Sequence, residues 1–160
     1  MASSEKNLSD VKVRKDAALK SYKFGVVVAE WNEQITEALY SGTHHTLLQA
    51  GISREQIKRI NVPGAFELSL GAQRLAKKAD VDAVICLGCV IQGETKHFDF
   101  ICSAVAHGIT NVGLKYDKPV VFGVLTTDNM KQALDRAGGK HGNKGDEAAA
   151  SAIKMLQIEA

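Results

Sequence analysis

The chain contains little of several residue types, and each shortage excludes a class of protein. Its 160 residues include three cysteines, two prolines and one tryptophan, and the formal net charge is only +2. Three cysteines cannot form a disulfide framework, and so small a charge gives no argument for nucleic acid as a partner. No apolar run approaches the ~20 residues that a membrane-spanning helix needs. We therefore expect a globular protein that binds neither nucleic acid nor a membrane.

The N-terminal part of the chain differs in composition from the rest. The first 23 residues are polar, carry acids as well as bases, and lack the apolar core of a secretory signal. Residues 1–21 show no sustained period and are predicted to form a flexible arm, and a single domain is predicted over residues 22–160. A cytoplasmic location is expected.

The cysteines do not form a metal site or a bond. Cys86 and Cys89 have C-x-x-C spacing, but Cys86 lies inside an apolar run that reads as a strand. Residues three apart in a strand point to opposite faces, so the two sulfurs cannot share a metal. Cys102 falls on the apolar stripe of the next predicted helix, and we interpret all three as packing residues.

Three apolar runs and one run that alternates, residues 57–62, are separated by segments of helical period. The predicted strands cover residues 24–29, 57–62, 81–87 and 120–125. The first predicted helix is capped by Asn32 and ended by Gly51, and apolar stripes predict two more over 65–76 and 98–112. A fourth is capped by Thr127 or Asp128 and reaches Ala137. A glycine-rich kink at 138–145 then leads into a last helix over 148–156. Strands that are apolar on both faces and separated by helices predict a flavodoxin-like α/β/α sandwich with a four-stranded parallel sheet.

A polar cluster follows each predicted strand. In parallel α/β folds ligands bind beyond the carboxyl ends of the strands, so these clusters are expected to meet along one edge. They are residues 30–32, 63–67, 93–97 and 126–128.

The cluster after the third strand is the most informative. Residues 88–97 form a glycine-bracketed loop at the start of a predicted helix, where free backbone N–H groups attract anions. The spacing is close to a Walker A loop, but Glu94 stands where the phosphate-binding lysine belongs. This excludes a nucleotide hydrolase and leaves a site for a smaller phosphate. His97, one turn on, is able to transfer protons near neutral pH. The pattern predicts acid–base chemistry on a phosphorylated metabolite.

Other candidate residues have two readings each. Trp31, the single tryptophan, is either a packing anchor or a platform for a planar heterocycle. Glu67 either caps a helix or accepts hydrogen bonds from ligand hydroxyls. Arg136 is either a helix-end charge or a bidentate phosphate clamp. Lys144 is either a solvated charge or reaches the edge of the site.

Five ordered motifs together resemble the 6,7-dimethyl-8-ribityllumazine synthase family, which makes the riboflavin precursor. The resemblance runs from about Phe24 to Leu156. Its motifs are Trp31-Asn32, Asn61 to Glu67, Gly93-Glu94-Thr95-Lys96-His97-Phe98, Phe122 to Thr127, and Arg136-Ala137-Gly138 with Gly142-Asn143-Lys144-Gly145.

The resemblance implies a role for each matching residue. For ribitylaminouracil it implies that Trp31 stacks on the pyrimidine and that the other contacts come from Ala65, Phe66, Glu67, Cys89, Val90, Ile91, Phe122 and Lys144. Phe122 would close the site from a neighbouring subunit. For the butanone phosphate the resemblance implies contacts from Glu94, Thr95 and Arg136. It implies that His97 is the proton-transfer residue. Gln92 departs from the family, because many members carry arginine there.

The implied reaction is the condensation of 5-amino-6-(D-ribitylamino)uracil with 3,4-dihydroxy-2-butanone 4-phosphate, a transferase reaction without metal or cofactor. The implied assembly is a pentamer, with an icosahedral shell of pentamers expected from the compact 138–145 segment, and riboflavin synthase is a further implied partner. The alternatives are an enzyme that dismutates lumazine, which would need no phosphate loop, and a flavin- or lumazine-binding shell protein of the same fold without catalysis.

Overall fold

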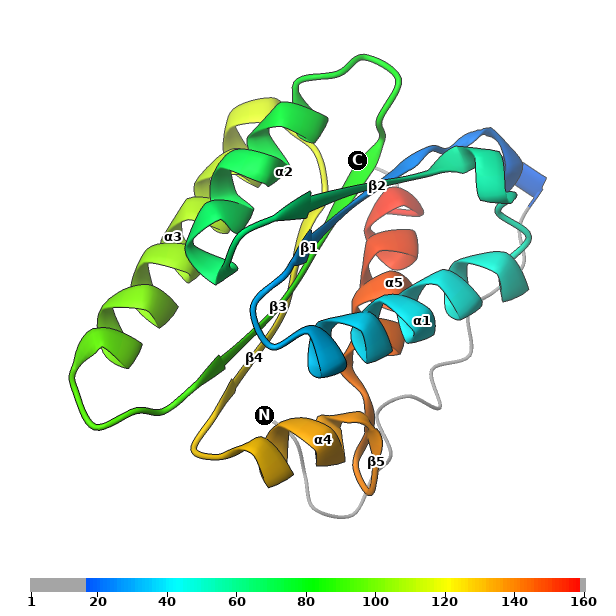
Figure 1. The fold of residues 1–160 in the computed structure, drawn as a ribbon. Coiled ribbons are helices and arrows are strands. Elements are labelled where there is room, and N and C mark those ends of the chain that lie inside the picture. Colours follow the sequence, from blue (N-terminus) through cyan, green and yellow to red (C-terminus); the bar gives the residue numbers. More distant parts are fainter. Residues whose placement is uncertain (1–16, 159–160) are drawn as a thin grey trace.

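The computed structural model describes residues 17–158 of the chain, and its helices and strands alternate (Figure 1). The strands are β1 (Phe24–Ala29), β2 (Ile57–Val62), β3 (Ala83–Ile91), β4 (Val120–Thr127), β5 (Ala137–Gly139) and β6 (Gly142–Asn143). The helices are α1 (Glu33–Gln49), α2 (Leu68–Ala76), α3 (His97–Tyr116), α4 (Met130–Arg136) and α5 (Lys144–Leu156), with 3-10 turns η1 (Ala17–Ser21), η2 (Arg54–Gln56) and η3 (Ala65–Glu67).

The main sheet confirms the predicted fold class. Its four strands are parallel in the order β2-β1-β3-β4. Helices α2 and α3 cover one face, and α1 and α5 cover the other (Figure 1). The chain order reverses at β1 and β3, so the carboxyl ends of these two central strands form the crevice where ligands bind in such folds.

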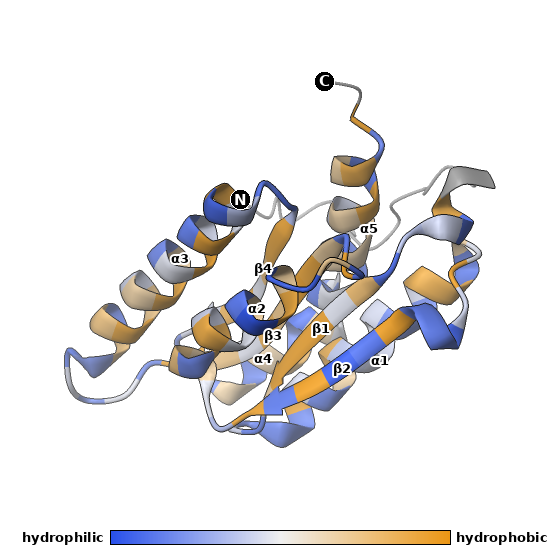
Figure 2. Cartoon of the chain, turned by 90° about the horizontal axis from the view of Figure 1, so that it is seen from above, coloured by the Kyte–Doolittle hydropathy of each residue, from blue (hydrophilic) through white to orange (hydrophobic). Residues whose placement is uncertain are grey.

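Each face of the sheet carries its own hydrophobic core, because side chains alternate along the central strands. On β1, Val26 and Val28 join the core beneath α1 and α5, whereas Val27 and Ala29 join the core beneath α2 and α3. The edge strand β2 is mixed, with Lys58 exposed beside half-buried neighbours. Figure 2 shows the same contrast, as β1 is mostly orange and β2 alternates with blue.

The cysteines lie as the strand spacing predicts. Cys86 belongs to the α2–α3 core and Cys89 to the α1–α5 core, on opposite faces of β3. Cys102 is half-buried on α3, and all three thiols are free. Burial raises the pKa of each of them.

The third strand is longer than predicted, which shortens the loop before α3. Gly88 to Ile91 pair with β4 instead of forming a loop, and only residues 92–96 connect β3 to α3. Gly88 serves packing: a Cβ there would lie 2.9 Å from Cδ1 of Leu68 on α2. The prediction that Gly88 opens a phosphate loop was therefore wrong, and Gly93 is the glycine that remains in it.

The segment between α4 and α5 also differs from prediction. It forms a short antiparallel hairpin of β5 and β6 where a kink was predicted. Helix α4 is capped by Asn129, whose side chain accepts a hydrogen bond from the Gln132 backbone N–H at 3.0 Å. Thr127 lies in β4, so neither it nor Asp128 is the cap.

The packed part of the chain begins before residue 22. Residues 17–21 form η1, and Leu19 is completely buried in the α1–α5 core. Leu19 thus packs with the domain, while residues 1–16 of the predicted arm lie outside the described residues. Between residues 17 and 158, none of the helices combines the length and apolar character that a membrane span needs.

Candidate active site

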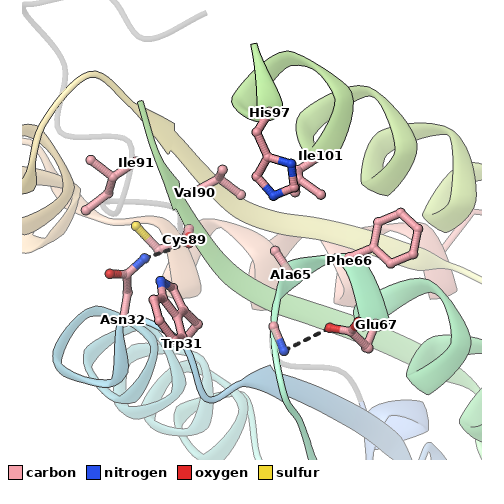
Figure 3. A pocket seen from close by; sticks show the side chains of 11 residues that line it. Trp31, Asn32, Ala65, Phe66, Glu67, Cys89, Val90, Ile91, His97 and Ile101 are labelled. Carbon is pink, nitrogen blue, oxygen red and sulfur yellow. Dashed lines mark hydrogen bonds between the residues drawn. The ribbon is translucent and has the colours of Figure 1, made fainter. Parts of the chain in front are cut away.

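A pocket of about 390 Å³ opens at the carboxyl ends of β1, β2 and β3. Three of the four predicted clusters contribute to it, and the cluster after β4 does not. Figure 3 shows the side chains arranged around the end of β3, with His97 on one side and Trp31 on the other. The lining residues are Trp31, Asn32, Gly64, Ala65, Phe66, Glu67, Cys89, Val90, Ile91, His97 and Ile101.

The turn from β1 to α1 supplies Trp31 and Asn32. Trp31 is 74% exposed, so it is not a core packing residue within this chain. Its backbone N–H donates to the carbonyl of Pro63 at 3.1 Å, which ties the turn to the end of β2. Asn32 was predicted as a helix cap, but its side chain makes no capping bond; its Nδ2 donates to the carbonyl of Cys89 at 3.0 Å.

The turn after β2 places a carboxylate at the pocket wall. Oε2 of Glu67 accepts a hydrogen bond from the backbone N–H of Gly64 at 3.0 Å. The capping interpretation of Glu67 is therefore correct for one oxygen, and the other oxygen has no hydrogen bond among those found in the described residues. Ala65 is buried, while Phe66 is 57% exposed at the rim.

The end of β3 forms the floor of the pocket. Cys89 is buried, whereas Val90 and Ile91 are half-buried and line the opening. Burial raises the pKa of the Cys89 thiol to about 11, so it is protonated at neutral pH and is a poor nucleophile. The Cys89 carbonyl already accepts the amide of Asn32.

His97 is the first residue of α3 and its ring faces the pocket (Figure 3). It is exposed, and its backbone N–H donates to Oγ1 of Thr95 at 3.4 Å. Glu94 and Thr95 lie in the exposed loop before it and do not line the pocket. Of the predicted phosphate-loop residues, only His97 lines the pocket, and Glu94 and Thr95 lie in the loop that leads to it.

Three predicted site residues lie away from this pocket. Phe122 is half-buried in β4 and packs against the α2–α3 core. Arg136 donates to the carbonyl of His141 and forms an ion pair with Glu147, and the two side chains of that pair are 15% and 12% exposed. Lys144 pairs with the other oxygen of Glu147 at 3.1 Å. One carboxylate thus compensates both predicted substrate-binding cations.

Three residues that line the pocket were not predicted as individual site residues. Asn32 and Gly64 lie in the strand-end clusters expected at this edge, but no contact with a ligand was assigned to either. Ile101 lies one helical turn after His97, a spacing that places both on one face of α3 and could have indicated it. Among the described residues, no three His, Cys, Asp or Glu side chains are grouped closely enough to hold a metal ion.

The pocket combines three chemical groups around an apolar floor. The indole offers a face for stacking, the carboxylate of Glu67 accepts hydrogen bonds, and the imidazole of His97 can transfer protons. Such a site suits a planar, hydroxyl-bearing ligand that undergoes acid–base chemistry.

Comparison with known proteins gives a single family. The family model described as 6,7-dimethyl-8-ribityllumazine synthase matches residues 21–160. A protein of that name from Cytophaga hutchinsonii is 67% identical, over 98% of this chain and 98% of the relative. Another from Flavobacterium johnsoniae is 52% identical over 99% of this chain and 83% of the relative, and one from Parabacteroides distasonis is 51% identical over the full length of both. On this similarity and on the pocket at its sheet edge, the chain belongs to the 6,7-dimethyl-8-ribityllumazine synthase family.

Proposed function

We propose that the chain catalyses the condensation of 5-amino-6-(D-ribitylamino)uracil with 3,4-dihydroxy-2-butanone 4-phosphate. The products are 6,7-dimethyl-8-ribityllumazine, phosphate and water, and the step is the penultimate one of riboflavin biosynthesis, carried out in the cytoplasm. The observation that carries the proposal is the pocket in which Trp31, Glu67 and His97 meet in a chain of this family.

The ribitylaminouracil is proposed to occupy the apolar part of the pocket. Its ring stacks on Trp31, whose exposed face is free to accept it. Glu67 has one oxygen available for the ribityl hydroxyls, because the other is held by the Gly64 N–H. Ala65 and Phe66 contribute the adjacent wall, and the β3 residues Cys89, Val90 and Ile91 contribute the floor.

The butanone phosphate is proposed to bind at the loop before α3. Glu94 and Thr95 lie in the loop just before a 20-residue helix that begins at His97, and the dipole at its N-terminus favours an anion there. Because Gln92 replaces the commoner arginine, the loop has little positive charge of its own, and Arg136 is assigned to supply more.

His97 is proposed to move protons between the two bound substrates. The 5-amino group condenses with the ketone to an imine and releases water. Phosphate is then eliminated, the intermediate tautomerises, and the ribitylamino nitrogen attacks the remaining carbonyl and releases a second water as the lumazine ring closes. Each step moves a proton at nitrogen, carbon or oxygen, which a positioned imidazole can accept and return. Holding the two substrates together supplies much of the remaining acceleration.

The active enzyme is proposed to be a pentamer, further assembled into an icosahedral shell, with Phe122 of one subunit closing the pocket of the next. Two features support this. Phe122, Arg136 and Lys144 do not line the pocket of their own chain. Large apolar side chains around the pocket are exposed in the single chain, among them Phe66 at 57% and Phe100 at 73%, which is typical of an interaction surface. Riboflavin synthase, which consumes lumazine, is a further proposed partner.

The proposal is tested by incubating the purified protein with both substrates and following lumazine fluorescence and phosphate release together. The expected result is that both appear in equal amounts and require both substrates. Lumazine binding without any turnover would favour the non-catalytic shell protein and refute the enzyme.

A further inference from the structure

Asn32 has an unusual backbone conformation at the rim of the pocket. Its φ of 62° and ψ of 46° place it in the left-handed region. Among the described residues only one other non-glycine residue, Asp117, has a positive φ. Asparagine tolerates this conformation better than most residues, whereas alanine pays a steric cost from its Cβ.

The side chain of Asn32 makes a long-range contact in place of a local one. It lies at the cap position of α1, yet its Nδ2 crosses to the carbonyl of Cys89 on β3 at 3.0 Å (Figure 3). The backbone pairing of β1 with β3 ends at Val28 and Leu87. The amide of Asn32 therefore continues the link between these strands beyond the last backbone pair.

The other side of the same turn is bound to β2. The N–H of Glu30 donates to the carbonyl of Val62 at 2.8 Å, and the N–H of Trp31 donates to that of Pro63 at 3.1 Å. Trp31 thus lies between one attachment to β2 and one to β3. Because Trp31 is 74% exposed in the single chain, packing within the chain leaves its side chain largely unconstrained, and the backbone of the turn sets the direction in which that side chain leaves the main chain.

We propose that Asn32 is a positioning residue that aims Trp31 across the pocket, through its left-handed backbone and its hydrogen bond to Cys89. This rests on the proposed function, in which Trp31 stacks on the ring of the ribitylaminouracil. The same bond uses one of the two acceptor positions of the Cys89 carbonyl at the floor of the pocket.

Three substitutions separate the contribution of the left-handed backbone from that of the hydrogen bond to Cys89. Asn32→Gly keeps the left-handed backbone and removes the amide. Asn32→Asp keeps the shape and removes the donor, so that a carboxylate faces the carbonyl. Asn32→Ala removes both. Asp117→Ala is the matched control, because Asp117 ends α3 with a φ of 49° and lies outside the pocket, so it carries the same backbone strain elsewhere.

The first measurement is the time-resolved fluorescence anisotropy of the full-length protein without substrate. Trp31 is the only tryptophan, so the signal belongs to one side chain. We expect a larger amplitude of fast indole motion in Asn32→Ala and Asn32→Asp than in the natural chain, with Asp117→Ala unchanged. The same motion in all four proteins would overturn the positioning role, whether or not the chain is a synthase.

The second measurement is the KM of each substrate. Loss of one hydrogen bond predicts an increase of about 3- to 10-fold in the KM for ribitylaminouracil in Asn32→Asp, with the KM for butanone phosphate unchanged. Asn32→Gly should show a smaller increase than Asn32→Ala. An equal rise in both KM values, or a rise of the same size in Asp117→Ala, would show that Asn32 acts only on stability. If the natural chain has no turnover, the proposed function fails, and the anisotropy still decides the inference.

Discussion

Replacement of Arg136 by alanine tests at once the proposed phosphate clamp and the ion pair of Arg136 with Glu147. The guanidinium donates to the carbonyl of His141 and to Glu147, and both charged side chains are largely buried. Removing one member of a buried pair leaves a charge without compensation and costs about 3–5 kcal/mol. Lys144 remains 3.1 Å from Glu147, however, and compensates part of that charge.

We therefore expect Arg136→Ala to lower the free energy of unfolding by about 1.5–3 kcal/mol, the value of a hydrogen bond to a charged group. For a domain of this size the corresponding fall in Tm is roughly 4–10 °C. The measurement is denaturation of the variant and the natural chain at one protein concentration. Lys131→Ala on the same helix is the control, because Lys131 is exposed and the loss of its pair with Asp135 should lower the stability far less than Arg136→Ala does.

The same variant should lose affinity for the phosphate substrate. A charge-assisted clamp predicts a loss of about 1.5–3 kcal/mol, roughly ten- to hundred-fold, against the butanone phosphate and almost none against ribitylaminouracil. Glu147→Gln separates the two roles, since it breaks the ion pair but leaves the guanidinium. That variant should lose stability and retain phosphate affinity. The measurement is a separate titration of each substrate. If Arg136→Ala lowers the affinity for both substrates equally, or for neither, the clamp is refuted.

Three further predictions concern chemistry, pH and assembly. His97→Ala should fold normally and lose turnover by roughly 10- to 10,000-fold, nearer the lower end, and unchanged turnover would remove His97 from the mechanism. The hydrogen bond from Arg59 holds the pKa of Glu37 below its usual value, so the ion pair stabilises the fold above the unfolded pKa of Glu37. Glu37→Gln should therefore be less stable than the natural chain at pH 7, by under about 1 kcal/mol. In denaturation series, the free energies of unfolding of the two proteins should converge as the pH falls through that lowered pKa. A difference that stays constant with pH would contradict the role of the ion pair. Light scattering at neutral pH should find a shell larger than one pentamer, and a single pentamer would exclude the shell.

Local pattern was sufficient for most of the fold. The runs 24–29 and 57–62 are strands with the predicted bounds, the first because it is a continuous apolar stretch and the second because its apolar residues are interspersed with polar ones and it stops at a turn signal. The alternation of strands and helices also predicted that the strand ends converge. Trp31, Glu67 and His97 meet in one pocket for that reason.

The tertiary structure alone decided features that depend on distant partners. Gly88 lies in a strand because it pairs with Val124 of β4, and it is a glycine that leaves room for Leu68; residue spacing cannot distinguish such a glycine from one in a loop. Asn32 is the N-cap residue of α1 as predicted, but its side chain bonds the Cys89 carbonyl, which only the folded sheet brings within its reach.

The ion pair of Arg136 shows most clearly what the sequence determines and what the tertiary structure decides. By itself the sequence determined which elements form, in what order, and which edge of the sheet carries the polar residues, since these follow from periodicity along the chain. Whether Arg136 was free or compensated depended on Glu147, which the hairpin of β5 and β6 brings next to it. Electrostatic and hydrogen-bonding partners are set by distance in space, and only the packing of α1, α4 and α5 fixed those distances.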